Sequence, residues 1–206
     1  MNNIRIRECK LEDTPDFLKI MVESFQDKFE IAFKRVPSIK ALKAMKSLFD
    51  SIIKLMDFPG LYVAKMNKSI AGAMQIKHNN MEGLLDDKAF KILSNILGFK
   101  KAIRASLILS IVESNLKENS LLIDSIAVAE KFRRVGVGKK ILTHALNISN
   151  ELNLRSMQLM VVSKNFGAQK FYSEFGFKKI GEKRSFLLKK LTKINSYYIM
   201  NYNIKA

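Results

Sequence analysis

The segment from residue 121 to residue 148 constrains the fold of this chain more than any other. Leu121–Val128 is an apolar run of strand length, a charged loop follows it, and Gly136-Val137-Gly138 opens an amphipathic helix. The apolar residues on one side of that helix are Ile141, Leu142, Ala145, Leu146 and Ile148. The first N–H groups of a helix lack partners within it, and the helix dipole places partial positive charge beside them. The segment therefore predicts a strand, a loop and a helix whose start binds an anion, typically a phosphate.

The residues around the two glycines narrow the kind of phosphate site. A missing Cβ lets an oxygen approach the backbone and permits positive φ, and Arg133, Arg134 and Lys139 supply charge nearby. A dinucleotide-binding loop needs a third glycine at position 141, and a P-loop needs Ser or Thr at position 140. Isoleucine and lysine stand there instead. The sequence therefore disfavours an NAD site and an ATPase or GTPase site, and leaves a plain strand-to-helix turn as the alternative.

A second motif follows about thirty residues downstream. The segment from Asn165 to Phe177 has the pattern Asn-x-x-Ala-x-x-x-Tyr-x-x-x-Gly-Phe, and the earlier loop has the pattern Arg-x-x-Gly-x-Gly. In this order, the two segments resemble the signatures of the Gcn5-related N-acetyltransferase (GNAT) family, over about residues 121 to 180. The resemblance implies an α+β acyl-CoA N-acyltransferase fold, with a mixed, mostly antiparallel central sheet flanked by helices.

The resemblance also implies acetyl-CoA as co-substrate and no metal. The backbone of Ile126 and Val128 is expected to separate from the neighbouring strand and hold the acetyl and pantetheine groups. Residues 134–139 are expected to cradle the pyrophosphate, and Asn165 to hydrogen-bond the pantetheine arm. The full set of predicted acetyl-CoA-binding residues is Ile126, Ala127, Val128, Arg133, Arg134, Val135, Gly136, Val137, Gly138, Lys139, Asn165, Ala168 and Phe171.

Two residues are predicted to be catalytic. By resemblance, Tyr172 is the general acid that gives a proton to the departing thiolate, whereas periodicity alone would make it an ordinary core aromatic. Asp124 is expected to orient the amine or act as a base, and its structural alternative is a hydrogen-bonding group of the strand. Asn165 has a structural alternative too, as the cap of the following helix.

One position departs from a family pattern. In the ribosomal-protein N-terminal acetyltransferases of the family, a glutamate base stands five residues before the motif asparagine, and here that residue is Met160. The proton of the amine would then leave through water, or to Asp124, Glu23 or Glu30, and the sequence does not choose among these routes.

The remaining segments predict a single domain over residues 1–206. Apolar alternation or short apolar runs predict strands at Ile4–Glu8, Leu61–Met66, Ser69–Lys77, Ser156–Val162, Phe177–Leu188 and Tyr197–Ile204. Two helices are expected before the first hairpin, separated by a loop over Phe29–Ser38. Residues 81–118 predict a helical pair with a break near Gly98, inserted between the third and fourth strands. This pair is expected either to cover the acceptor cleft or to form a homodimer surface.

Composition bears on partners and location. The chain has 36 Lys and Arg against 19 Asp and Glu, a formal charge of +17, and residues 119–190 hold 14 basic and 5 acidic groups. The charge predicts an anionic partner, unless it only reflects a lysine-rich genome. The single cysteine and the charged N-terminal segment predict a reducing, cytoplasmic setting. The most apolar segment, Ala105–Val112, is too short to span a membrane. No membrane partner is therefore expected.

The function predicted from these observations is acetyl transfer from acetyl-CoA to a primary amine of a small molecule or a protein. The positive field argues against polycationic acceptors. A basic RNA- or ribosome-binding module on the same fold is an alternative, but nucleic acid is disfavoured because no basic strand motif with stacking aromatics is present. A non-catalytic acyl-CoA sensor is the third possibility.

Overall fold

The computed structural model describes residues 3–55, 60–78, 86–110, 118–184 and 194–204 of the protein. Seven strands form one sheet in the order β1-β2-β3-β4-β5-β7-β6. Their bounds are Ile4–Glu8 (β1), Leu61–Met66 (β2), Ser69–Lys77 (β3), Ser120–Val128 (β4), Ser156–Val162 (β5), Lys178–Arg184 (β6) and Ser196–Asn203 (β7). Only β4 and β5 pair in parallel, and every other neighbouring pair of the sheet is antiparallel. The predicted mixed, mostly antiparallel sheet is confirmed.

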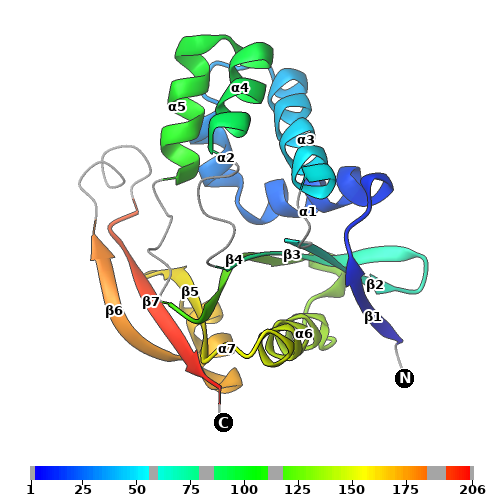
Figure 1. Ribbon diagram of the computed structural model, residues 1–206, viewed down its shortest axis with the longest axis vertical. Coiled ribbons are helices and arrows are strands. Elements are labelled where there is room, and N and C mark those ends of the chain that lie inside the picture. The colour runs from blue at the N-terminus through cyan, green and yellow to red at the C-terminus, as the bar shows by residue number, and fades with distance from the viewer. Residues whose placement is uncertain (1–2, 56–59, 79–85, 111–117, 185–193, 205–206) are drawn as a thin grey trace.

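Helices cover both faces of the sheet (Figure 1). On one side lie α1 (Thr14–Ser24), α2 (Gln26–Ala32), α3 (Ser38–Leu55), α4 (Asp86–Leu97) and α5 (Phe99–Ser110). On the other side lie α6 (Val137–Glu151) and α7 (Phe166–Phe175). Short 3-10 helices, η1 (Leu11–Asp13) and η3 (Glu130–Phe132), follow β1 and β4. The chain thus forms a layer of helices on each face, with α1 lying on the sheet and α4 and α5 standing farther from it (Figure 1).

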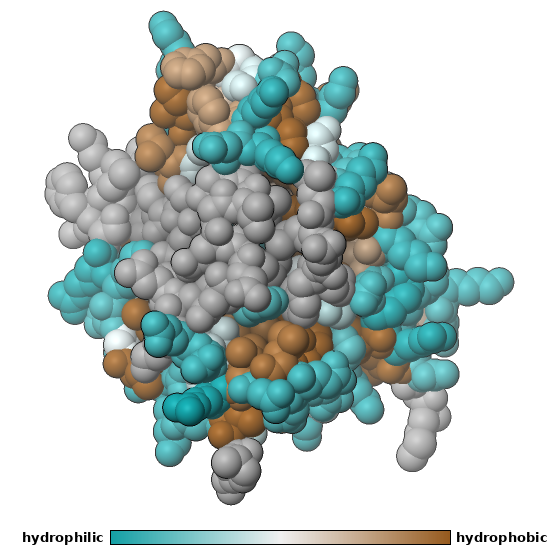
Figure 2. Space-filling view, viewed as in Figure 1, coloured by the Kyte–Doolittle hydropathy of each residue, from teal (hydrophilic) through white to brown (hydrophobic). Residues whose placement is uncertain are grey.

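The helical insertion is confirmed. Helices α4 and α5 stand between β3 and β4, and Gly98 separates them with a φ of +82°, a left-handed conformation that favours glycine. The space-filling view in Figure 2 shows apolar side chains gathered over these two helices at the top of the molecule. Phe99, which begins α5, is 65% exposed.

The predicted loop over Phe29–Ser38 is wrong in its first part, because α2 extends to Ala32. The guanidinium of Arg104 on α5 donates a hydrogen bond to the carbonyl of Ile31, 3.1 Å away. Carbonyls at the end of a helix lack partners within it, so this contact satisfies one of them. The end of α2 is therefore stabilised by a residue more than seventy positions away in the sequence.

Three buried clusters hold the layers together. The largest packs α6 and α7 against the sheet, and the second packs α1 and Phe49 of α3 against β2 and β3. The third, in the part of the chain that the structure describes, contains no strand residue: it joins α2, α3, α4 and α5 through residues such as Ala44, Leu93 and Ala105. The five alanines of this cluster leave room for close helix packing, so the upper helices have a core of their own.

Candidate active site

The strands β4 and β5 pair over half of their length and then separate. Pairing ends at Ile123 opposite Leu159, while β4 stays paired with β3 as far as Val128. Because no described strand pairs with this second half of β4 on its β5 side, backbone groups there are open to a ligand. The expected separation of the backbone at Ile126 and Val128 from the neighbouring strand, β5, is therefore confirmed.

A β-bulge begins the open half of β4. Gln75 pairs with Ser125 and Ile76 with Ile123, so Asp124 is an extra residue that has no register partner in β3. Bulges bend a strand and change the direction of its side chains, and they occur often beside active sites. The carboxylate of Asp124 lies 4.0 Å from the ammonium of Lys77 and is 28% exposed.

The gap between the strands belongs to a cleft of about 1580 Å³. The cleft runs from the starts of α6 and α7, past β4 and β5, to the helices α1 to α5. Fourteen of the fifteen predicted site residues line it: Asp124, Ile126, Ala127, Val128, Arg133, Arg134, Gly136, Val137, Gly138, Lys139, Asn165, Ala168, Phe171 and Tyr172. The remaining one, Val135, is 43% exposed and lies outside this lining.

The loop before α6 has the conformation that its glycine predicts. Gly136 is the N-cap residue with a φ of +91°, and Arg134 also has a positive φ of 62°. No side chain among the described residues caps the helix, and its first turn has no acidic residue. Its first internal hydrogen bond runs from the Lys140 N–H to the Gly136 carbonyl. The preceding N–H groups are therefore available to an anion, with positive charge from the helix dipole.

Gly138 serves a different purpose from Gly136. A Cβ at Gly138 would lie 3.0 Å from Cζ of Phe171, so the missing side chain lets α6 and α7 approach each other. Arg133 turns back to the end of β4, where its Nε donates to the carbonyl of Val128 over 3.3 Å. The loop is thereby tied to the open half of β4.

Asn165 is the N-cap of α7, as its structural alternative predicted. Its Oδ1 accepts a hydrogen bond of 3.1 Å from the N–H of Ala168, and this bond occupies the backbone donor of Ala168. The side chain of Gln169 reaches back to the carbonyls of Val162 and Ser163 at 3.2 and 2.9 Å. These contacts fix the turn between β5 and α7, and the Asn165 side chain lines the cleft as well.

Tyr172 is both a core residue and a cleft residue. It is 8% exposed, and its ring packs against Phe171 and Phe177 with centroid distances of 5.4 and 5.9 Å. Burial raises the pKa of its phenol well above the usual 10. The hydroxyl therefore stays protonated well beyond neutral pH, and burial also makes it a weaker acid than a phenol in water.

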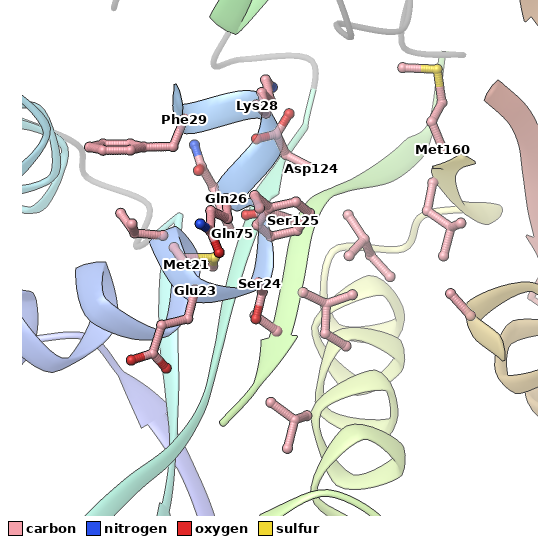
Figure 3. A pocket seen from close by; sticks show the side chains of 18 of the residues that line it. Met21, Glu23, Ser24, Gln26, Lys28, Phe29, Gln75, Asp124, Ser125 and Met160 are labelled. Atoms are coloured by element: carbon pink, nitrogen blue, oxygen red, sulfur yellow. The ribbon is translucent and has the colours of Figure 1, made fainter. Parts of the chain in front are cut away.

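The candidate proton acceptors do not lie together. In Figure 3, Asp124 and Ser125 lie on β4, while the carboxylate of Glu23 points away from them. Glu30 is not among the described residues that line the cleft, and its carboxylate accepts a 2.7 Å hydrogen bond from the Gln26 side chain. Met160 lies across the gap on β5. Of the three candidate carboxylates, Asp124 is the one at the open half of β4.

Sequence reasoning missed several residues of the cleft. Gln75 and Ser125 are register partners that line it beside Asp124, and Ser24 and Gln26 line it from the α1–α2 turn. The sequence could have indicated Gln75 as a site residue, because it is the one polar side chain between Ile70 and Ile76 in an otherwise apolar strand. No sequence pattern distinguishes Ser24, Ser125 or Gln26 as site residues.

Among the described residues, no helix is both long and apolar enough to cross a bilayer. Within the same ranges, no three His, Cys, Asp or Glu side chains are grouped as metal ligands.

Solved structures of acetyltransferases share the fold. One is an acetyltransferase that is 19% identical to this chain with a TM-score of 0.71, and the match covers 98% of this chain and 100% of the other. Another is an N-acetyltransferase from Staphylococcus aureus Mu50, also 19% identical with a TM-score of 0.71, and the match covers 96% of this chain and 100% of the other. A putative streptothricin acetyltransferase from Bacillus anthracis, solved with acetyl coenzyme A, is 20% identical with a TM-score of 0.51, covering 75% of this chain and 68% of its own. At these identities the likeness shows the fold.

Sequence comparison identifies the family. No curated protein matches the chain significantly. The model of the acetyltransferase (GNAT) family, however, matches residues 18–177, which include both predicted motifs and the strands that separate. The chain therefore belongs to the GNAT family of N-acetyltransferases.

Proposed function

We propose that this protein transfers an acetyl group from acetyl-CoA directly to a primary amine, within one domain formed by residues 1–206. The observation that carries the proposal is the continuity of one cleft. It joins the uncapped start of α6 at Gly136 to the open half of β4 and to the buried phenol of Tyr172. The distant structural relative solved with acetyl coenzyme A supports the same ligand.

The residues present fit acetyl-CoA. The N–H groups at the start of α6, with Arg134 and Lys139 beside them, suit a pyrophosphate. The unpaired edge of β4 from Ile126 to Val128 suits the amides of a pantetheine arm and a carbonyl oxygen that gains negative charge. When bound, acetyl-CoA would supply the activated acetyl thioester.

The chain's own residues then act on protons and charge. As the amine nitrogen forms its bond to the acetyl carbon, the C–S bond breaks and the Tyr172 hydroxyl donates its proton to the leaving sulfur. A substrate bound as an ammonium first loses one proton to solvent. After the attack, the surplus proton of the nitrogen passes to the carboxylate of Asp124, directly or through water, and a proton then returns through solvent to the phenolate of Tyr172, so that both groups are restored. The backbone N–H groups of β4 stabilise charge on the carbonyl oxygen. The products are the N-acetylated amine and the free thiol of CoA.

The first prediction is that acetyl-CoA stabilises the protein through Gly136. At about 100 times its dissociation constant, a ligand adds roughly 2.7 kcal/mol, or about 5–10 °C in melting temperature for a chain of this size. Gly136→Glu places a carboxylate where the phosphates bind and should abolish the shift. Gly98→Glu is the matched control, since Gly98 also has a positive φ and open space around it but lies between α4 and α5.

Thermal-shift titrations of the three proteins measure this. A shift in the wild type and in Gly98→Glu, and none in Gly136→Glu, is expected. No shift in the wild type, together with salt-sensitive binding of RNA, would overturn the proposal in favour of a nucleic-acid-binding module. A shift without thiol release for any amine would favour an acyl-CoA sensor.

A further inference from the structure

The acceptor end of the cleft has two chemically different parts, and they limit what can bind there. The first part is polar and lies at the open half of β4, where Asp124, Ser125 and Gln75 are adjacent through the strand register. Figure 3 shows these side chains beside Gln26 of α2. A primary ammonium can find a carboxylate and neutral acceptor oxygens here, next to the carbonyl-binding edge of β4.

The second part is an apolar wall. It consists of half-buried side chains from four helices that all line the cleft: Phe29 of α2, Met45, Leu48 and Ile52 of α3, Phe90 of α4 and Leu109 of α5. On α3 the three residues are spaced by three and four positions, so they share one face of the helix. The wall is therefore built on regular helices and continues away from Asp124.

The rings of the wall are held in place from behind. Phe29 packs on Phe33 with a centroid distance of 4.8 Å, and Phe90 packs edge-on against Phe99 at 5.6 Å. Neither supporting ring lines the cleft. Aromatic pairs of this kind contribute about 0.5–1.5 kcal/mol beyond their buried area, so each contact stabilises the observed position of its ring.

The charges on this end argue against a second cation in the acceptor. Its lining contains three carboxylates, Glu23, Asp27 and Asp124, and three ammonium groups, Lys28, Lys77 and Lys88. The local charge therefore cancels. On an acceptor whose body extends along the wall, a second or third ammonium would lie against apolar side chains, a position that is unfavourable for a cation.

We infer that the acceptor is a small monoamine with an apolar body: one primary amino group at Asp124 and an alkyl or aryl portion against the wall. This inference rests on the proposed acetyl transfer and names the class of its second substrate. Binding of the body should strengthen with its apolar area, by about threefold to fourfold for each methylene that reaches the wall.

The test is a series of linear alkylamines from butylamine to octylamine, compared with spermidine, in an assay of CoA thiol release with products identified by mass spectrometry. Because the amino group is the same throughout the alkylamine series, differences report on the body alone. The value of kcat/KM should rise at least tenfold from butylamine to octylamine, and spermidine should be a poorer substrate than octylamine.

Two matched variants localise the effect. Ile52→Ala removes part of the wall and should lower kcat/KM for octylamine about tenfold, while kcat/KM for butylamine changes less than twofold. Ile39→Ala makes the same change on the same helix at a residue that is 82% exposed and outside the cleft, and should change neither value. The acetyl-CoA thermal shift of both variants verifies that they are folded.

The outcomes separate the two proposals. If acetyl-CoA neither stabilises the protein nor releases thiol with any amine, the proposed function fails. If acetyl-CoA stabilises the protein but kcat/KM does not rise with alkyl length, spermidine is preferred, or no amine of the series is acetylated, the inferred substrate class is wrong and the cofactor site stands.

Discussion

Tyr172 and Asn165 each have a place in the fold besides their place in the cleft. The ring of Tyr172 belongs to the largest buried cluster, and the side chain of Asn165 begins α7. The structural roles that the sequence offered as alternatives, a core aromatic for Tyr172 and a helix cap for Asn165, are therefore both present in the fold. A substitution that tests chemistry at these residues must keep the packing or the cap, or it will report on stability.

Tyr172→Phe meets that condition, because it keeps the ring and removes only the hydroxyl. We expect kcat to fall about 100-fold or more, since general acid catalysis contributes roughly that much, while the acetyl-CoA thermal shift is retained. Stopped or continuous assays of thiol release measure kcat. Full activity in this variant would show that another group protonates the sulfur.

The same residue sets an expectation for pH. Burial raises the pKa of Tyr172, so the folded protein keeps this proton through pH 10 and loses it only above that. Activity that depends on the protonated phenol should therefore show no decline from this group between pH 8 and 10. A decline near pH 10 that disappears in Tyr172→Phe would contradict the assignment.

At the level of elements, sequence patterns predicted most spans because local signals were strong. The hairpin of β2 and β3, for example, has the predicted bounds, with Asn67 at a positive φ in its turn. Two features could not be predicted from local sequence patterns. The C-terminal end of α2 depends on Arg104 in a distant helix, and the bulge at Asp124 depends on how β4 aligns with β3. Both are set by non-local contacts, which periodicity does not contain.

Close approach of α6 to the sheet is set by Gly72 on β3. A Cβ there would lie 2.8 Å from Ile141 Cδ1 and 3.0 Å from the Ala127 carbonyl, and the latter is backbone. We expect Gly72→Ala to destabilise the protein by about 1–3 kcal/mol and to weaken acetyl-CoA binding, because the Ala127 carbonyl on β4 and the Val137 and Ile141 side chains at the start of α6 must give way to the new Cβ. Denaturant titration and thermal shift measure the two effects.

Gly167→Ala is the control for that change. Its Cβ would meet only Asn165 Oδ1 at 3.9 Å, and it lies in the first turn of α7 with an ordinary φ. Alanine should therefore leave stability unchanged or raise it by up to about 1 kcal/mol. Equal stability of Gly72→Ala and the wild type would mean that α6 tolerates a wider spacing.

For the whole molecule, the charge of +17 should act on acetyl-CoA binding. Arg133, Arg134, Lys139 and Lys164 all line the cleft near the two helix starts. Since salt screens such charges, we expect the dissociation constant of acetyl-CoA to rise several-fold between 50 and 500 mM NaCl. Lys139→Gln should flatten this dependence, measured by calorimetry.

Lys68→Gln is the comparison, because Lys68 is an exposed residue of the β2–β3 turn outside the cleft. It removes the same charge from the molecule as a whole and should leave the salt dependence as it is in the wild type. If both variants flatten it equally, the field of the entire protein, rather than the loop before α6, attracts the anion.

The separate core of the upper helices has a consequence for how such enzymes diversify. Ala44, Leu93 and their neighbours pack α2 to α5 together in a cluster that holds no described strand residue, and Phe49 of α3 ties these helices to β2 and β3. The cofactor end of the cleft rests on the cluster on the other face of the sheet, which substitutions within the upper cluster do not touch. A chain built this way can exchange one acceptor for another by changing a single module, and keep its acetyl donor while doing so.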